Sequence, residues 1–413
     1  MITSDPKRLG ARAFMRLHAL NAYSDRPDQL ERLYLSPAHR KAVDAVAAMM
    51  REAGFDSVHI DALGTVVGRY EAKVAGCPAL LIGSHIDTVK DAGSYDGMLG
   101  VIAGIGVVEA LQHAGERLDF AVEVLAFGDE ENVRFPSNLS SSRAVAGSFD
   151  FTTLDGRDEN GISLREALIA FGGNPDGIAA LARHKDDVIG YVEMHIEQGP
   201  VLDQENRPVG IVTAISGASR RRIIVTGEAG HAGTVPMGLR KDALSAAAEM
   251  ALAIEALGTH AENGVATIGQ LHVEPGAVNV IPSRVRFTID ARAPHDQVRE
   301  RLVADIEAAL HRIAQRRNVK VDIQPFYDAP AAPASDTIMQ GLAAAIEARQ
   351  IEARFLPSGA GHDAMVMGAL CPMGMMFVRC KDGISHNPAE SMTEADAGLA
   401  IAILLDFVRH YKS

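Results

Sequence analysis

The chain has 413 residues, of which 47% are hydrophobic and 23% charged, and its formal net charge at pH 7 is -13. This length favours two domains, and the composition is that of a folded protein rather than a disordered one. The acidic balance argues against nucleic acid as the main partner, because no basic surplus is available to neutralise phosphates.

The cysteines and the first residues of the chain indicate a reducing compartment. Cys77, Cys371 and Cys380 form no close pair, so neither a disulfide framework nor a zinc knuckle is expected. The sequence starts without the basic residues and apolar run of a signal peptide. Its longest apolar run, residues 99–108, is too short to cross a bilayer. We therefore expect a cytoplasmic protein without a membrane partner.

The first half of the sequence alternates short apolar runs with amphipathic segments, a pattern typical of an α/β layered fold. Helical spacing predicts helices at residues 37–53 and 97–114. Apolar runs predict strands at residues 79–83, 120–127 and 191–195. Polar segments follow these strands, so we expect the catalytic and binding side chains to lie at the strand ends.

The pattern changes near residue 215. Strand signals then alternate with helix signals in the order β-α-β-β-α-β, at residues 221–227, 241–257, 264–273, 285–291, 294–317 and 319–325. This is the order of a ferredoxin-like unit. We therefore predict an insert at residues 215–325 within a catalytic domain made of residues 1–214 and 326–413. The Ala/Pro-rich residues 328–335 are the expected return linker.

Five segments place metal-ligand side chains at the ends of these elements. The segments GSHIDTV, SYDG, GDEEN, EMHIEQG and ISHNPAE contribute, in that order, His85 and Asp87, Asp96, Glu130 and Glu131, His195, and His386. Imidazoles and carboxylates are the donors that zinc and similar cations prefer, and two cations need several donors with one shared carboxylate. Adjacent acids at a strand end point in different directions, so one can bind a cation while the other stays free as a base. Each segment alone is a weak signal, whereas the five together indicate a two-metal hydrolytic site.

These segments, with GHAGTVPMGLRKDA, NVIPSRVRFTIDAR and SGAGHDA, resemble the M20-type metallopeptidase superfamily. The resemblance is to its branch of N-carbamoyl-L-amino-acid hydrolases, allantoate amidohydrolases and β-ureidopropionases, and it runs from about residue 33 to the C-terminus. His195 favours this branch, because the peptidase members usually carry an acid there. The resemblance implies a three-layer α/β catalytic domain like that of di-metal exopeptidases, with an inserted ferredoxin-like α+β domain that acts as lid and dimerisation domain.

The resemblance also implies a role for each ligand. Asp96 would bridge two divalent cations, with Zn²⁺ as the first choice and Mn²⁺, Co²⁺ or Ni²⁺ as alternatives. Two pairs of side chains would complete the two sites, His85 with His195 and Glu131 with His386. Asp87 would orient His85 as its hydrogen-bond acceptor, and Glu130 would be the general base.

Residues of the insert are expected to contact the substrate. In a homodimer, His231 would reach the partner's active site and help to hold the developing oxyanion. Asn279 and Arg292 would bind a substrate carboxylate, since the fork of arginine can donate to both oxygens. Gln198 would line the same cavity, and Gly359 would offer its backbone N–H to an anion. The structural alternatives are a salt bridge for Arg292, a turn for Asn279 and an ordinary loop for Gly359.

Three places depart from the pattern of the resembling family. Asn132-Val133 stands where Gly-Ser is common, Ser141 replaces a usual glycine, and Ala218 occupies the place of a glutamine. These departures leave the metal ligands untouched and leave the choice of substrate open.

The metal pattern and the resemblance together predict hydrolysis of the terminal C–N bond of a ureido acid, with release of ammonia and carbon dioxide. Allantoate, N-carbamoyl-α-amino acids and N-carbamoyl-β-alanine all carry the required ureido group and carboxylate. One alternative is a di-metal aminoacylase or exopeptidase on the same scaffold, and another is a non-catalytic relative that binds a metal or a small acid. We also expect the insert to close over the substrate.

Overall fold

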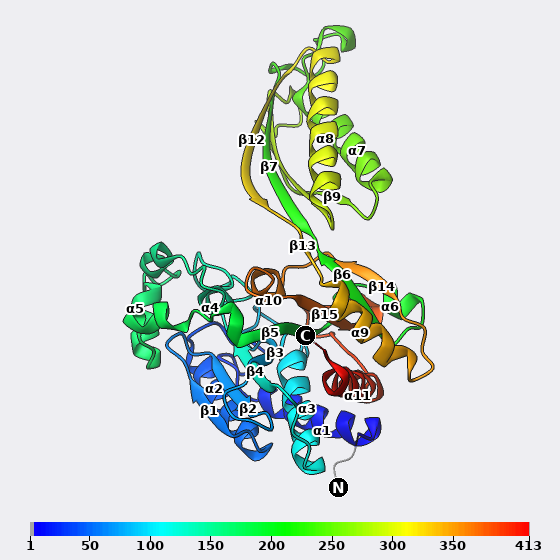
Figure 1. The fold of residues 1–413 in the computed structure, drawn as a ribbon. Coiled ribbons are helices and arrows are strands. Elements are labelled where there is room, and N and C mark those ends of the chain that lie inside the picture. Colours follow the sequence, from blue (N-terminus) through cyan, green and yellow to red (C-terminus); the bar gives the residue numbers. More distant parts are fainter. Residues whose placement is uncertain (1–3, 413) are drawn as a thin grey trace. The chain divides into compact units, whose positions relative to one another are not determined.

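The computed structural model describes residues 4–412, and the chain divides into two compact units. Unit 2 consists of Ala214–Pro333 and Pro357–Ala360, and unit 1 contains the remaining described residues. Figure 1 colours the chain from blue at its N-terminus to red at its C-terminus, so the green-to-yellow stretch between two parts of unit 1 is unit 2.

The largest sheet has nine strands in the order β1-β2-β4-β3-β5-β15-β6-β13, with β14 paired to β6. Its four central strands, β3 (Ala79–His85), β4 (Ala121–Phe127), β5 (Val188–Ile196) and β15 (Met373–Val378), are parallel to one another. The carboxyl ends of these four strands therefore meet at one edge of the sheet. The outer strands are β1 (Ser57–Ile60), β2 (Val66–Tyr70), β6 (Val209–Ile215), β13 (Ala332–Pro333) and β14 (Phe355–Ser358).

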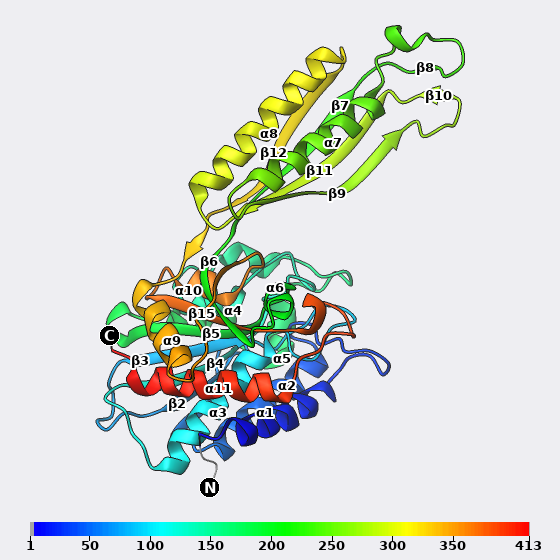
Figure 2. The same cartoon turned by 90° about the vertical axis from the view of Figure 1, so that its right-hand side faces the viewer.

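Helices cover both faces of this sheet, which makes unit 1 a mixed α/β structure. Figures 1 and 2 show α1 (Pro6–Asn21), α3 (Met98–Ala114) and α11 (Glu394–His410) on one face, and α4 (Ser140–Val145) and α10 (Asp363–Met367) on the other. The remaining helices of unit 1 are α2 (Pro37–Glu52), α5 (Leu164–Phe171), α6 (Val201–Gln204) and α9 (Asp336–Glu347). Within residues 4–412, no helix combines the length and the apolar character that crossing a membrane requires.

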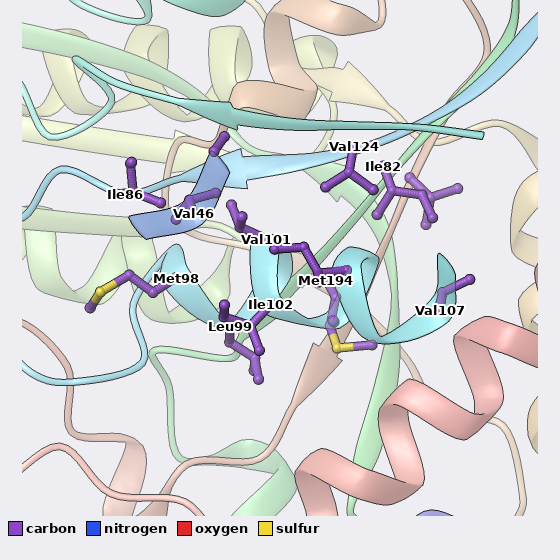
Figure 3. Close-up of a cluster of buried hydrophobic side chains, with 14 of the residues drawn as sticks. Val46, Ile82, Ile86, Met98, Leu99, Val101, Ile102, Val107, Val124 and Met194 are labelled. Carbon is purple, nitrogen blue, oxygen red and sulfur yellow. The ribbon is translucent and has the colours of Figure 1, made fainter. Parts of the chain in front are cut away.

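The helix α3 lies at the centre of the hydrophobic core. Figure 3 shows its residues Val101 and Ile102 in one cluster of buried side chains with Ile82 of β3 and Val124 of β4. The helix is apolar on all sides and buried from Met98 to Leu111, as expected of a helix enclosed by other elements. Such an enclosed helix fixes the loop before it, which carries Asp96.

Two glycines of α3 differ in how closely the chain approaches them. A Cβ atom at Gly100 would lie 2.3 Å from the carbonyl oxygen of Met194, whereas one at Gly106 would meet only Ile401 at 3.4 Å. We therefore expect Gly100→Ala to lower the free energy of unfolding by about 1–3 kcal/mol, because the helix must move away from β5. The matched variant Gly106→Ala should leave stability unchanged or raise it, since alanine favours helix. Thermal denaturation followed by circular dichroism compares the two, and equal melting temperatures would contradict this packing argument.

Unit 2 contains a four-stranded antiparallel sheet in the order β12-β7-β11-β9. Along the chain its main elements are β7 (Gly217–Thr226), α7 (Ala243–His260), β9 (Val265–Glu274), β11 (Arg284–Ala293), α8 (Asp296–Arg316) and β12 (Lys320–Ala329). A short ribbon of β8 (Gly230–His231) and β10 (Val280–Ile281) is added to them. Figure 2 shows α7 and α8 side by side on one face of the sheet.

The two faces of this second sheet differ in polarity. Strand β11 alternates, with Val285, Phe287, Ile289 and Ala291 buried in the cluster that contains α7 and α8. The residues between them point to the opposite face, because successive side chains of a strand alternate. That face is polar and carries no helix within the described residues.

The stretch expected to be the return linker, residues 328–335, is partly strand. Strand β12 continues to Ala329, and Ala332–Pro333 form β13, which pairs with β6. The sequence predicts a last strand that ends at Pro325. In the structure β12 is an edge strand, where a missing donor is tolerated, and its pairing with β7 shifts register between Pro325 and Tyr327.

Candidate metal centre

The metal ligands expected in unit 1 lie at the carboxyl ends of its parallel strands. His85 is the last residue of β3, and His195 is the last but one of β5. Glu130 and Glu131 lie in the loop that follows β4. Asp96 precedes α3, and its loop turns at Gly97, which has φ +71°. A Cβ atom on Gly97 would lie 2.4 Å from the His85 ring, so glycine leaves the room that this ring occupies.

Asp96 presents one carboxylate oxygen to each of two groups of side chains. Its Oδ1 lies 3.5 Å from Nε2 of His85 and 3.2 Å from Nε2 of His195. Its Oδ2 lies 3.4 Å from Nε2 of His386, which is itself 3.5 Å from Oε2 of Glu131. Donors on one tetrahedral zinc ion lie roughly 3.3 Å from one another, given the usual bond lengths. These separations are therefore those of two ligand sets that share a carboxylate.

Donor atoms within 4.8 Å of one another form two sets that share Asp96, namely His85–Asp96–His195 and Asp96–Glu131–His386. A third set, His85–Glu130–Glu131, brings Glu130 next to both. The nearest contact of Glu130 to a histidine is 3.9 Å, between its Oε2 and Nε2 of His85. The structure thus brings all five expected ligands and the expected base together.

The electrostatics of this cluster suit divalent cations. Burial and the neighbouring Asp96 raise the pKa of Glu131 to about 7. Burial also raises the pKa of Glu130 well above its usual range, with Glu131 acting in the same direction and His85 against it. So many buried carboxylates are costly to ionise together unless positive charge lies among them. Nitrogen and oxygen donors around a cluster of acids fit zinc and related cations.

Asp87 contacts the site in two ways. The closest acceptor for Nδ1 of His85 is the main-chain oxygen of Asp87 at 3.1 Å, and its carboxylate Oδ1 is 3.7 Å away. The carboxylate accepts the backbone N–H groups of Glu130, at 3.4 Å, and Glu131, at 3.3 Å. Asp87 therefore holds the loop of the two glutamates as well as the histidine ring.

Two residues that hold Asp96 were not expected in that role. Ser385 donates its hydroxyl to Oδ2 of Asp96 at 2.5 Å and lies 2.9 Å from Glu390. Glu390 accepts the backbone N–H groups of Tyr95, at 2.7 Å, and Asp96, at 3.2 Å. Both residues lie in the segment GISHNPAE, in which the residue types alone indicate only the histidine as a ligand.

Gln198, expected to line the substrate cavity, contacts the same carboxylate. Its Nε2 donates to Oδ2 of Asp96 at 2.7 Å and lies 3.4 Å from Nε2 of His386. Gln198 has φ +57°, a left-handed conformation that aims its side chain back toward Asp96. Its position beside the ligands is compatible with substrate contact but adds the task of orienting Asp96.

His231 and Asn279 lie next to each other on the ribbon of unit 2. His231 pairs with Val280, and the backbone oxygen of Asn279 accepts the N–H of Ala232 at 3.0 Å. The backbone N–H of Gly233 donates to Nδ1 of His231 at 3.0 Å. A neutral imidazole that accepts at Nδ1 carries its proton on Nε2, so this ring can donate a hydrogen bond.

Arg292 and Gly359 also meet within unit 2. Arg292 donates from Nε and Nη2 to the carboxylate of Asp290 at 2.9 and 3.0 Å, and from Nη1 to the backbone oxygen of Gly359 at 2.7 Å. Three of its five N–H groups are thus engaged, which leaves one on Nη1 and one on Nη2. These two remaining groups can still donate hydrogen bonds to a carboxylate.

The residues that depart from the family pattern have identifiable surroundings. Asn132 has φ +56°, a conformation that glycine adopts freely and asparagine tolerates. Ser141 is buried and its hydroxyl accepts the N–H of Gly128 at 3.3 Å. Ala218 stands directly opposite Arg292 in the register of β7 and β11. Ala218 is therefore the departure that lies next to Arg292.

Comparison with known proteins identifies the family of this chain. The family model for peptidase family M20/M25/M40 matches residues 81–410. The N-carbamoyl-L-amino acid amidohydrolase of Geobacillus stearothermophilus is 40% identical over 396 residues, which covers 96% of this chain and 97% of that protein. The allantoate deiminase of Arabidopsis thaliana is 38% identical over 427 residues, covering 96% and 81%. A solved structure of a hydantoinase/carbamoylase family amidase from Burkholderia ambifaria is 35% identical with a TM-score of 0.90, covering 97% and 96%.

Proposed function

This chain belongs to peptidase family M20/M25/M40, as its resemblance predicted, and from that premise we propose the reaction that it catalyses. It is an amidohydrolase that cleaves the C–N bond of a ureido acid. The observation that carries this proposal is the pair of ligand sets sharing Asp96, with Glu130 beside them. His195 at the position where peptidase members usually carry an acid favours a ureido substrate over a peptide.

The residues present fit two divalent cations, with Zn²⁺ as the first choice and Mn²⁺, Co²⁺ or Ni²⁺ as alternatives. His85 and His195 would hold one, Glu131 and His386 the other, and Asp96 both. When bound, such cations lower the pKa of water and stabilise negative charge on a carbonyl oxygen. Asp87, Ser385 and Gln198 would keep these ligands oriented through the contacts described above.

Glu130 would move the protons of the reaction. It takes a proton from the water whose oxygen attacks the ureido carbonyl carbon, and it delivers that proton to the nitrogen that leaves as ammonia. The bond that forms is C–O and the bond that breaks is C–N, and the remaining carbamate decays to carbon dioxide and a free amine. Glu130 belongs to neither of the two sets that share Asp96, which leaves its carboxylate free to accept a proton.

Unit 2 would supply the groups that recognise the substrate. The Nε2–H of His231 would donate to the oxyanion that forms at the carbonyl. Arg292 would bind the substrate carboxylate with its two remaining N–H groups, and Asn279 and Gly359 would add hydrogen bonds. Holding the carboxylate fixes the position of the ureido group, so that its carbonyl carbon stays within reach of the attacking water.

We propose a homodimer in which His231 completes the site of the partner subunit. Mixing His231→Ala with Glu130→Gln subunits is then expected to restore roughly a quarter of wild-type activity, because half of the dimers are mixed and one of their two sites is intact. Ammonia release after subunit exchange measures this. The double variant mixed with His231→Ala is the control and should restore nothing. Failure of the first mixture to gain activity, despite demonstrated exchange, would contradict action across subunits.

A substrate panel tests the reaction class itself. Ammonia release from allantoate, N-carbamoyl-L-amino acids and N-carbamoyl-β-alanine should occur with the metal-loaded protein, and N-acyl amino acids and dipeptides should be poor substrates. Cleavage of N-acyl amino acids alone would instead identify an aminoacylase or exopeptidase. No turnover of any compound at full metal loading would favour a binding protein.

A further inference from the structure

Three arginines gather on the helix-free face of the sheet in unit 2. Arg220 and Arg222 lie two positions apart on β7, so both point to the same face, roughly 7 Å apart along the strand. In the register of β7 and β11, Arg220 stands opposite Asp290 and Arg222 opposite Thr288. Arg292 is two positions beyond Asp290 on the same face. A hollow of about 750 Å³ lies over these side chains and is lined by all three arginines.

Only one carboxylate contacts these arginines in the structure. Asp290 accepts from Nε of Arg220 at 3.0 Å and from Nε and Nη2 of Arg292. Arg222 is exposed, lies over the ring of Phe326 at 5.4 Å and has no acidic partner among residues 4–412. The three arginines that line the hollow therefore share one contacting carboxylate, on a chain whose net charge is -13.

The neighbouring Arg221 differs from Arg222, because its charge is fully paired within the fold. It points to the other face of the sheet and is neutralised by Glu307 on α8 and by Asp328, both within 3.3 Å. Arg222, in contrast, is held by an aromatic ring that leaves its N–H groups to solvent. A second cation with free donors on the same face as Arg292 is an arrangement suited to a second anion.

We propose that Arg222, with Arg220, forms a subsite for a second carboxylate on the substrate, so that the preferred substrates are ureido dicarboxylic acids. This inference rests on the proposed function, in which Arg292 binds the first carboxylate. Ala218 stands opposite Arg292 in the sheet, at the place where the resembling family carries a larger glutamine. The two carboxylates would lie on arginines of one face, Arg292 for the first and Arg222 with Arg220 for the second.

The test compares N-carbamoyl-L-glutamate with N-carbamoyl-L-glutamine, which differ in one charge at nearly equal shape. The wild-type enzyme is expected to favour the glutamate compound about 10-fold or more in kcat/KM. Arg222→Gln should remove most of that preference by raising KM for the glutamate compound, with kcat little changed. The matched control is Arg286→Gln, on the same face of β11 but roughly 20 Å along the strand from Arg292, where it pairs with Glu274. It should preserve the preference.

Arg220→Gln separates direct binding from positioning, since Arg220 also holds Asp290. Direct binding predicts a loss for the glutamate compound only. Equal losses for both compounds, together with an unchanged Arg222→Gln enzyme, would overturn the proposal, as would a wild-type enzyme without a preference for the diacid.

Calorimetric binding of glutarate to the full-length protein reports on the subsite without turnover. Arg222→Gln should weaken it about 10-fold, and unchanged binding would overturn the proposal even if every ureido acid is hydrolysed. Conversely, turnover absent with all ureido acids while this binding is lost in Arg222→Gln would contradict the proposed function and leave the anion subsite standing.

Discussion

Replacing Glu130 with glutamine is expected to lower kcat for ammonia release by about 10²–10⁴-fold while both cations stay bound. The amide keeps nearly the same shape but cannot accept the proton of the attacking water. Glu130 lies beside both ligand sets without belonging to the two that share Asp96, so its loss should leave metal affinity nearly intact. Steady-state kinetics and metal analysis of the same preparation measure the two effects separately.

The adjacent glutamate provides the control. Glu131→Gln changes the same functional group one residue away, yet Glu131 is 3.5 Å from the histidine with which it would share a cation. This variant should therefore lose metal together with activity. A Glu130→Gln enzyme that remains fast, or one that loses metal as Glu131→Gln does, would show that the two roles are assigned wrongly.

Replacing Asp96 with alanine is expected to remove both cations at once and to leave activity at background. Its two oxygens face different ligand sets, and Ser385 and Gln198 donate to the oxygen that faces His386. Without the shared carboxylate, each set keeps only two of its three ligands. Metal analysis after dialysis should find fewer than one cation per subunit.

A variant of one set alone is the comparison. His386→Ala removes a ligand that is half exposed and belongs only to the set with Glu131. It should lose one cation and retain the other. If Asp96→Ala and His386→Ala lose the same number of cations, Asp96 does not serve both sites.

The sequence predicted the elements that carry strong local signals. The helix predicted at residues 37–53 corresponds to α2, which runs from Pro37 to Glu52. Ser36 caps its first turn and Pro37 occupies its first position. The apolar run at residues 120–127 corresponds to β4, Ala121–Phe127. These predictions are confirmed because a cap or a buried run is local information. In contrast, the extension of β12 beyond Pro325 depends on its being an edge strand, which only the assembled sheet reveals.

The residues of the site also divide into those with a local signal in the sequence and those that depend on contacts between distant segments. Histidines and paired acids at strand ends can be recognised by type and spacing, and the structure brings them together. Ser385 and Glu390 escaped notice because their importance comes from contacts with Asp96, nearly 300 positions earlier in the chain. Asp87 was expected to orient His85, whereas its support of the two glutamates through their backbone N–H groups depends on a turn geometry that no motif encodes.

The most direct test of the central claim is to remove metal from the protein with a chelator and restore it stepwise. Ammonia release from an N-carbamoyl-L-amino acid should be absent without metal and should reach its maximum at two equivalents of Zn²⁺, Mn²⁺, Co²⁺ or Ni²⁺ per subunit. Full activity of the metal-free protein, or two bound equivalents without ammonia from any ureido acid, would contradict a two-metal ureido acid hydrolase.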